Sequence, residues 1–259
     1  MSALPPLDLH AHVDPRIAAH DLTNLRAAIF AVTRSLAEAE QALARTDLAT
    51  VWGVGCHPGL AASQQAFSAA TFSKLLDRTA FAGELGLDGK SRVPISAQRT
   101  TLRSALEVLT TKPRVLSLHS YGATETLLVE LEATPTKGVI LHWWLGDPIL
   151  TKRAVQLGCY FSVNASAAGK SELLRTIPRD RLLTETDHPF GNRRSKGPRL
   201  PGSVADVEQV IGRLHGLTEL ETRLLIWRNL RAVVRQVGCS SLLPGTIRAS
   251  LATVGEQSS

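Results

Sequence analysis

Short apolar runs alternate with amphipathic stretches along almost the whole chain, and this alternation constrains the fold more than any other feature. The apolar runs predict strands, and several are continuous enough to be buried on both faces, as parallel strands are. The predicted strands cover residues 7–14, 27–33, 51–57, 80–88, 115–120, 138–144, 160–164 and 182–187. The predicted helices cover residues 35–44, 63–77, 97–109, 124–132, 148–157, 170–176, 203–214 and 219–237.

This order of strands and helices in a chain of 259 residues predicts an α/β fold, a (β/α)₈ TIM barrel. A doubly wound open sheet is the alternative. Such sheets usually bind ligand at a glycine-rich first turn, and no Gly-x-Gly-x-x-Gly follows the first predicted strand. We expect one barrel domain over residues 1–240 and a poorly ordered C-terminal tail over residues 241–259.

Histidines and carboxylates stand at the C-terminal ends of the predicted strands, where barrel enzymes carry their active sites. The first strand alternates apolar and polar residues, so His10 and His12 point to the same face and can share one metal ion. Five of the eight histidines lie at such ends. The polar residues at the later strand ends are His57, Glu84, Asp88, His119, His142, Asn164, Glu185 and Asp187.

Imidazole and carboxylate ligands together suit Zn²⁺ or Mn²⁺, and Mg²⁺ where carboxylates and water dominate. Two ions need a bridging ligand, and Glu84 on a middle strand is the natural candidate. Asp187 would be both a ligand and an acceptor for a proton from water. No lysine ends a predicted strand, which disfavours amidohydrolases bridged by a carboxylated lysine. Hydrolysis is the favoured reaction class, because the chain has no redox-cofactor fingerprint.

The chain carries a formal net charge of +6, which favours polyanionic partners such as nucleic acid. A basic run follows the last predicted strand and contains Arg193, Arg194, Lys196 and Arg199. These side chains either contact phosphates or form a solvated loop. Trp143, directly after His142, either stacks on a nucleobase or packs against a neighbouring element.

The three cysteines are widely spaced and odd in number, which fits reduced thiols in a cytoplasmic protein. The N-terminus lacks a basic start followed by an apolar stretch, so we expect no signal peptide. No apolar run is long enough to span a bilayer. These features predict a cytoplasmic protein without membrane association.

Six motifs in a fixed order give the chain a strong resemblance to a known family. The motifs are Asp-Leu-His-Ala-His at 8–12, Gly-Cys-His-Pro at 55–58, Gly-Glu-Leu-Gly-Leu-Asp at 83–88, Leu-His-Ser at 118–120, Leu-His-Trp at 141–143 and Leu-Thr-Glu-Thr-Asp-His-Pro at 183–189. Their order and spacing resemble those of the TatD-type metal-dependent deoxyribonucleases. The resemblance covers nearly the whole chain.

The resemblance implies a phosphodiesterase that acts on DNA ends with two divalent metal ions, Mg²⁺, Mn²⁺ or Zn²⁺. The implied ligands of the first ion are His10, His12, Glu84 and Asp187. The implied ligands of the second ion are Glu84, His119 and His142. His57 and Glu185 would orient phosphate and water beside the ions, with Asp187 as the third catalytic group. Arg193, Arg194 and Trp143 are the candidate substrate-binding residues.

The chain departs from the family pattern after the motif histidine of the fifth predicted strand. His119 is followed by Ser120 and Tyr121 where the family usually has Ser-Arg, and a plausible phosphate contact is lost with that arginine. Residues 141–190 look closer to a subgroup of the Qat anti-phage defence system. That resemblance implies partner proteins in a larger assembly. The sequence contains no indication of the oligomeric state.

Two other functions remain open at this point. The same pair of ions could serve an amidohydrolase-type or small-phosphoester hydrolase, or the barrel could bind a partner protein without catalysis. The complete ligand set speaks against a non-catalytic barrel. A wide basic groove would favour nucleic acid, and a closed apolar pocket would favour a small ligand.

Overall fold

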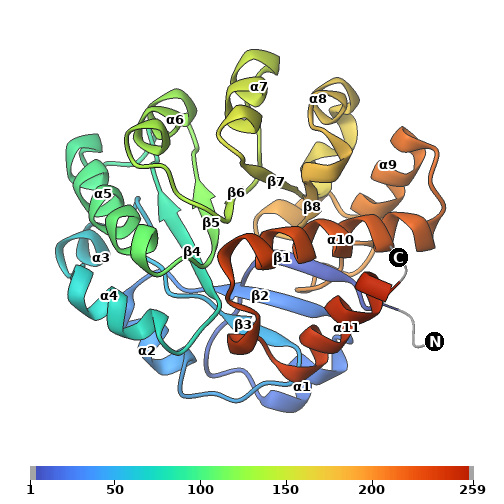
Figure 1. Ribbon diagram of the computed structural model, residues 1–259, viewed down its shortest axis with the longest axis horizontal. Coiled ribbons are helices and arrows are strands. Elements are labelled where there is room, and N and C mark those ends of the chain that lie inside the picture. The colour runs from blue at the N-terminus through green and yellow to red at the C-terminus, as the bar shows by residue number, and fades with distance from the viewer. Residues whose placement is uncertain (1–3, 257–259) are drawn as a thin grey trace.

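The structure is a computed structural model that describes residues 4–256. Its centre is a ring of parallel strands with helices around the outside, a TIM barrel (Figure 1). The eight strands within this range are β1 (Leu7–His12), β2 (Ala28–Val32), β3 (Thr50–Trp52), β4 (Phe81–Gly86), β5 (Val115–His119), β6 (Val139–Leu141), β7 (Tyr160–Val163) and β8 (Leu182–Thr184). Each lies within a predicted strand or within one residue of it, so the predicted fold class is confirmed.

The ring consists of two parallel sheets that meet at two seams. One sheet has the order β1-β2-β3 and the other the order β4-β5-β6-β7-β8. An isolated parallel bridge between Val54 and Ala82 joins them after β3. After β8, the backbone N–H of Asp187 donates to the carbonyl of His10 at 2.8 Å. The second seam therefore places the last motif of the chain against the first.

Helices pack around the strands, and most were predicted. They are α1 (Ala19–Asn24), α2 (Leu36–Ala42), α3 (Ala61–Gln65), α4 (Ala69–Leu76), α5 (Ile95–Thr111), α6 (Thr124–Ala133), α7 (Pro148–Gln156), α8 (Ser171–Thr176), α9 (Ala205–His215), α10 (Glu219–Val237) and α11 (Gly245–Glu256). The helix predicted over residues 63–77 is divided, because the side chain of Ser68 accepts from the Thr71 N–H and starts α4. Within residues 4–256, none of the helices has the length and apolar character needed to cross a bilayer.

The N-terminal ends of the strands are closed by α10 and α11. The indole N–H of Trp227 donates to the carbonyl of Pro5 just before β1, at 2.9 Å, and Asn229 Nδ2 donates to the Leu182 carbonyl at the start of β8, at 2.8 Å. Helix α11 buries Ile247, Leu251 and Val254 against the same core.

The prediction of a poorly ordered tail is therefore wrong for residues 245–256. The buried residues of α11 recur at positions i, i+4 and i+7, the spacing of one helical face. Thr246 also donates its hydroxyl to the carbonyl of Leu48, across the N-terminal face of the barrel. Packing this apolar face against the core supplies the free energy that keeps the helix folded.

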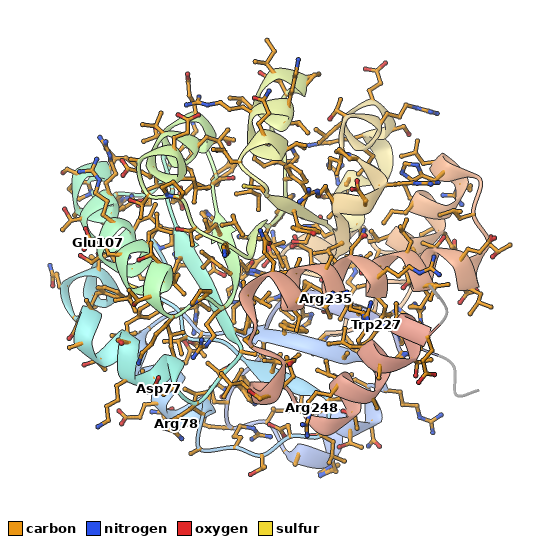
Figure 2. The ribbon with its side chains drawn as sticks, in the orientation of Figure 1. Asp77, Arg78, Glu107, Trp227, Arg235 and Arg248 are labelled. Carbon is orange, nitrogen blue, oxygen red and sulfur yellow. The ribbon has the colours of Figure 1, made fainter. Side chains whose placement is uncertain are left out.

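We predict that Trp227→Ala lowers the free energy of unfolding by about 3–5 kcal/mol, the range for truncating a buried large aromatic side chain. Trp227 is fully buried and donates the hydrogen bond to Pro5, so the variant leaves both a cavity and an unpaired carbonyl. Figure 2 shows its position on α10. Urea denaturation measures the change. Leu220→Ala on the same helix is the matched control, since Leu220 is 69% exposed and its change should stay within about 0.5 kcal/mol.

Candidate metal centre

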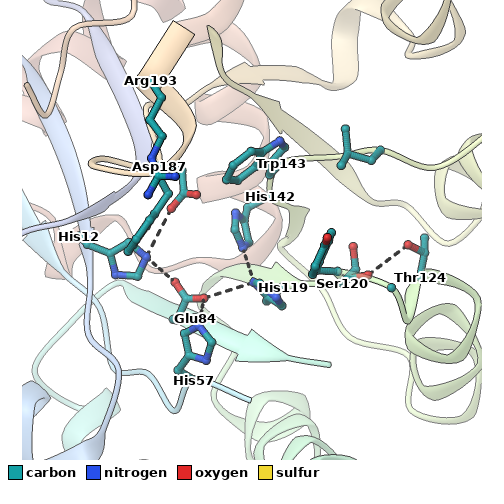
Figure 3. Close-up of a pocket in the computed structure, with 14 residues that line it drawn as sticks. His12, His57, Glu84, His119, Ser120, Thr124, His142, Trp143, Asp187 and Arg193 are labelled. Atoms are coloured by element: carbon teal, nitrogen blue, oxygen red, sulfur yellow. Dashed lines mark hydrogen bonds and ion pairs between the residues drawn. The ribbon is translucent and has the colours of Figure 1, made fainter. Parts of the chain in front are cut away.

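Glu84 lies at the centre of the C-terminal rim of the barrel and faces two groups of histidines (Figure 3). Its Oε2 lies 2.8 Å from His10 Nε2 and 3.2 Å from His12 Nε2. Its Oε1 lies 3.4 Å from His119 Nδ1 and 3.7 Å from His57 Nε2. Glu84 is 1% exposed, so both of its oxygens lie inside the protein, each near different histidines.

The side chains around Glu84 form overlapping sets of metal-ligand atoms. Within each set, all ligand atoms lie within 4.8 Å of one another, and the sets are His10, His12 and Asp187; His57, Glu84 and His119; and His10, His142 and Glu185. His142 joins the second group, because its Nε2 lies 3.1 Å from His119 Nδ1. The structure thus brings together all six residues predicted as ligands.

Buried atoms without partners mark the places that a cation would fill. Asp187 Oδ1 is buried and has no hydrogen-bond partner among the described residues, and it lies 3.3 Å from His12 Nε2. Within residues 4–256, one ring nitrogen of His119 and one of His142 are also buried without a hydrogen-bond partner. Buried polar atoms are rarely left unpaired, and imidazole and carboxylate donors suit divalent transition metals. The residues present therefore fit a divalent metal centre.

The electrostatics of the rim favour positive charge. Burial opposes charge on Glu84, but the imidazoles of His10 and His12 outweigh it and hold the pKa of Glu84 well below its ordinary value. Burial also opposes charge on His12, yet Glu84 and Asp187 raise the pKa of His12 to about 10. The carboxylates thus attract protons to the neighbouring imidazoles. The same attraction would hold divalent cations, which displace those protons.

Hydrogen bonds outside the cluster orient its imidazoles. His10 Nδ1 lies 2.7 Å from Ser117 Oγ, which aims Nε2 at Glu84. The backbone N–H of Gly59 donates to His57 Nδ1 at 2.9 Å, so the proton of the neutral ring sits on Nε2. Sequence reasoning missed Ser117. The signal was its position two residues before His119, which places both on one face of β5.

Asp8 links the first motif to the last through hydrogen bonds. Its carboxylate accepts from the Thr186 N–H at 2.8 Å, the Thr186 hydroxyl at 2.6 Å and the Gly202 N–H at 2.7 Å. Burial raises the pKa of Asp8 to about 6 in spite of these donors. Asp8 therefore holds β1 and the segment after β8 in register, and it is not among the metal-ligand sets of the described residues.

Glu185 lies directly after β8, beside His10 and His142, but below the surface of the cavity. The residue is fully buried and does not line the cavity above the cluster. Its Oε1 accepts from the Trp143 backbone N–H and from Asn164 Nδ2, each at 2.9 Å, and its Oε2 accepts from the Ser162 hydroxyl. Protein donors contact both oxygens, and Glu185 also lies with His10 and His142 in a group of possible metal ligands, so its predicted role in orienting phosphate and water stays a prediction. Glu185 fixes the backbone after His142.

A cavity of about 650 Å³ opens above the cluster. Its floor contains His12, His57, Glu84, His119, His142 and Asp187. Its walls contain Tyr121, Trp143, Leu145, Phe190 and Arg193. Two of the three predicted substrate-binding residues, Trp143 and Arg193, thus reach the cavity (Figure 3). The third, Arg194, is exposed and does not line it.

Backbone strain is concentrated at this site. Glu84, Trp143 and Asp187 adopt φ values of 58°, 43° and 41°, in the left-handed region that residues other than glycine rarely enter. Arg26 is the remaining non-glycine residue of this kind between residues 4 and 256. Such strain persists where the surroundings impose it, and it is typical of functional sites.

Comparison with known proteins identifies the family. The sequence profile described as "TatD related DNase" matches residues 7–235. The chain belongs to the TatD family. The match runs from the first residue of β1 almost to the end of α10, so it includes every TatD motif described above.

Curated relatives of this TatD-family chain match parts of it. An uncharacterised metal-dependent hydrolase of Bacillus subtilis, YabD, is 26% identical over 167 residues, which are 59% of this chain and 64% of the relative. A protein of Schizosaccharomyces pombe named deoxyribonuclease Tat-D is 31% identical over 117 residues, 42% of this chain and 37% of the relative. The chain thus spans less than two thirds of the length of these relatives.

Solved structures support the TatD fold over most of the chain. YJJV, a TatD homologue from Escherichia coli K12, superposes with a TM-score of 0.78 at 21% identity, over 88% of this chain and 96% of that one. A TatD-family hydrolase from Entamoeba histolytica gives a TM-score of 0.74 at 15% identity, over 90% of this chain and 99% of that one. At these identities the likeness concerns the barrel alone.

Proposed function

We propose that this protein is a metal-dependent phosphodiesterase that hydrolyses DNA from its ends, using two divalent cations, Mg²⁺, Mn²⁺ or Zn²⁺. The observation that carries the proposal is the placement of Glu84. Its Oε2 faces His10 and His12, and its Oε1 faces His119, which lies beside His142. A single buried carboxylate between two such groups has the arrangement of a bridging ligand.

The cations supply positive charge that stabilises a displacement at phosphorus when they are bound. The side chains of the protein supply the proton acceptor and the orientation. Asp187 has an oxygen without a hydrogen-bond partner at the cavity floor, so it can accept a proton from the attacking water. His57 Nε2 carries the ring proton, because Nδ1 accepts from Gly59, and can donate it to a phosphate oxygen.

DNA is the substrate that the cavity walls support best. The walls combine aromatic faces with a guanidinium, since Trp143, Phe190 and Tyr121 lie around the floor and Arg193 lies above it. Aromatic side chains bind nucleobases by stacking, and arginine binds phosphate. The S. pombe relative is named a deoxyribonuclease, which agrees with this choice.

A small-phosphoester hydrolase is the second candidate. The cavity volume of about 650 Å³ falls within the range of sites that enclose small ligands. The role in anti-phage defence, the partner proteins and the cytoplasmic location stay predictions from the sequence.

Incubation of the purified protein with end-labelled single- and double-stranded DNA, in Mg²⁺, Mn²⁺ or Zn²⁺, tests the proposal. We expect stepwise shortening from an end, abolished by a chelator and restored by added metal. Bis(4-nitrophenyl) phosphate and 4-nitrophenyl phosphate are included as small substrates. Turnover of the small esters without any DNA shortening would favour the second candidate and overturn the first.

A further inference from the structure

A second cavity lies beside the first at the same rim of the barrel. It has a volume of about 550 Å³ and shares two wall residues with the first cavity, His12 and Phe190. Its other polar lining residues are Asp14, Arg16, Arg34, Glu38 and Gln41, and we call this cavity the arginine cleft. These residues come from the segment after β1 and from the segment after β2 with α2.

The wall between the two cavities is held in place. Phe190 stands edge-on to His12, with ring centroids 5.5 Å apart. Its backbone N–H donates to the Asp187 carbonyl at 2.7 Å, and the His12 N–H donates to the His188 carbonyl at 3.0 Å. Phe190 is 46% exposed, so its ring faces open space as well as the protein. A ligand that crosses Phe190 passes from one cavity into the other without leaving the rim.

The two arginines of the cleft differ in how closely their guanidinium groups are paired with carboxylates. Arg16 donates from Nε and Nη2 to the two oxygens of Asp14, at 3.0 and 2.7 Å, so this guanidinium is paired. The guanidinium of Arg34 makes no hydrogen bond within residues 4–256, and its Nε lies 3.6 Å from Glu38 Oε2. Its side chain is 54% exposed. Arg34 is therefore the less tightly paired cation of the cleft, and its guanidinium N–H groups can still donate to an anion.

The backbone of Arg34 is nevertheless fixed. Its N–H donates to Glu38 Oε2 at 2.7 Å, and its carbonyl accepts from the His57 N–H at 3.0 Å. Arg34 lies two residues after the end of β2, whose Val32 lies beside His12 in the sheet. A side chain on a rigid base next to the metal centre loses little backbone entropy when it binds a ligand.

We propose that the arginine cleft binds the nucleotide next to the one in the first cavity, with Arg34 on its phosphate. The proposal rests on the nuclease function and specifies its substrate, an oligonucleotide that spans Phe190. Gln41 and the carboxylates of Asp14 and Glu38 add hydrogen-bonding groups that suit the polar edges of a base or sugar. Mononucleotides and small aryl esters would occupy the first cavity alone.

Arg34→Ala tests the cleft. We expect kcat/KM for a single-stranded oligonucleotide to fall about tenfold, because one charge-assisted contact is lost. We expect kcat/KM for bis(4-nitrophenyl) phosphate to stay at the wild-type value. Arg16→Ala should have a smaller effect on the oligonucleotide, since Arg16 is already paired. Arg248→Ala on α11 (Figure 2), at the N-terminal face of the barrel, is the remote control and should behave as wild type.

Glu38→Gln gives the opposite change. It removes the negative charge beside Arg34 and keeps an oxygen that can accept from the Arg34 N–H. We expect tighter oligonucleotide binding in this variant. Binding is measured by fluorescence anisotropy over a range of salt concentrations. For Arg34→Ala the slope of log affinity against log salt should be shallower by about 0.7, the value for one single-strand phosphate contact.

The outcomes separate this proposal from the nuclease proposal. If the wild type cleaves the oligonucleotide and Arg34→Ala has the same kcat/KM and salt slope, the cleft proposal is overturned and the nuclease proposal stands. If the wild type binds the oligonucleotide without cleaving it, the nuclease proposal fails and the binding comparison still decides the cleft. If the wild type neither binds nor cleaves it, both proposals fail.

Discussion

Asp187→Asn is expected to lower kcat for DNA and for small phosphodiesters by about 10³-fold, the effect of removing a positioned proton acceptor that also binds a cation. Asp187 Oδ1 has no hydrogen-bond partner among the described residues and lies 3.3 Å from His12 Nε2. Asparagine has nearly the same volume but cannot accept the proton at neutral pH, and its amide is a poor metal ligand. The measurement is the initial rate of shortening of end-labelled DNA at saturating substrate.

The variant should fold as the wild type does. The backbone bonds at this position, from the Asp187 N–H to the His10 carbonyl and from the Phe190 N–H to the Asp187 carbonyl, do not involve the side chain. The metal-free variant should therefore keep its midpoint in urea. Asp180→Asn, at an exposed carboxylate before β8, is the matched control and should keep full activity. A kcat for Asp187→Asn within about threefold of wild type would contradict the assigned role.

The convergence of the ligands could be predicted because it follows from backbone periodicity. His10 and His12 are two residues apart on a strand, so they share a face. The other ligands end strands of one parallel barrel, and the C-terminal ends of such strands meet at one rim. Neither step needs the position of any other side chain. Glu84, His119 and His142 were therefore assigned to the rim from the sequence alone, and the structure places them there.

The position of Glu185 could not be predicted in the same way. Glu185 and Asp187 are two residues apart, and an extended strand would have brought both to the cavity. Strand β8 ends at Thr184, and the backbone turns at Asp187 with a φ of 41°. Asp187 reaches the cavity floor, whereas Glu185 stays inside the barrel with Ser162 and Asn164 from the neighbouring strand and the segment after it. The turn depends on tertiary contacts such as the bond between Asp187 and His10.

The arginine cleft was missed for a related reason. Arg34 belongs to no motif and lies far in sequence from Phe190, so nothing in the chain links them before β1, β2 and the segment after β8 are assembled. The sequence predicts substrate contacts at the basic run after β8 instead, because charge is concentrated there. Of that run, Arg193 reaches the first cavity and Arg194 does not. Charge density along the chain therefore indicated the rim but not which arginines line its cavities.

Glu84→Gln is expected to weaken the binding of both cations by about 100-fold or more. Substituting a residue that merely hydrogen-bonds to a metal ligand already lowers metal affinity by about 10–100-fold, and loss of a ligand itself should lower it at least as much. One carboxylate faces both groups of histidines, so one substitution should affect both binding steps. His119→Ala should weaken only one step, because His119 lies on the Oε1 side of Glu84. Isothermal titration with Mn²⁺ or Zn²⁺, together with metal analysis after dialysis, measures the stoichiometry of each variant.

Two further variants distinguish a bridging role of Glu84 from an effect of its negative charge alone. Glu84→Asp keeps the negative charge but shortens the side chain by one methylene, so the carboxylate can no longer reach both groups, and the second binding step should be lost. Glu107→Gln removes an exposed carboxylate on α5 (Figure 2) and should bind metal as the wild type does. Loss of a single step in Glu84→Gln, with the other unchanged, would show that Glu84 serves one cation. The two groups of histidines would then bind cations without a bridging carboxylate.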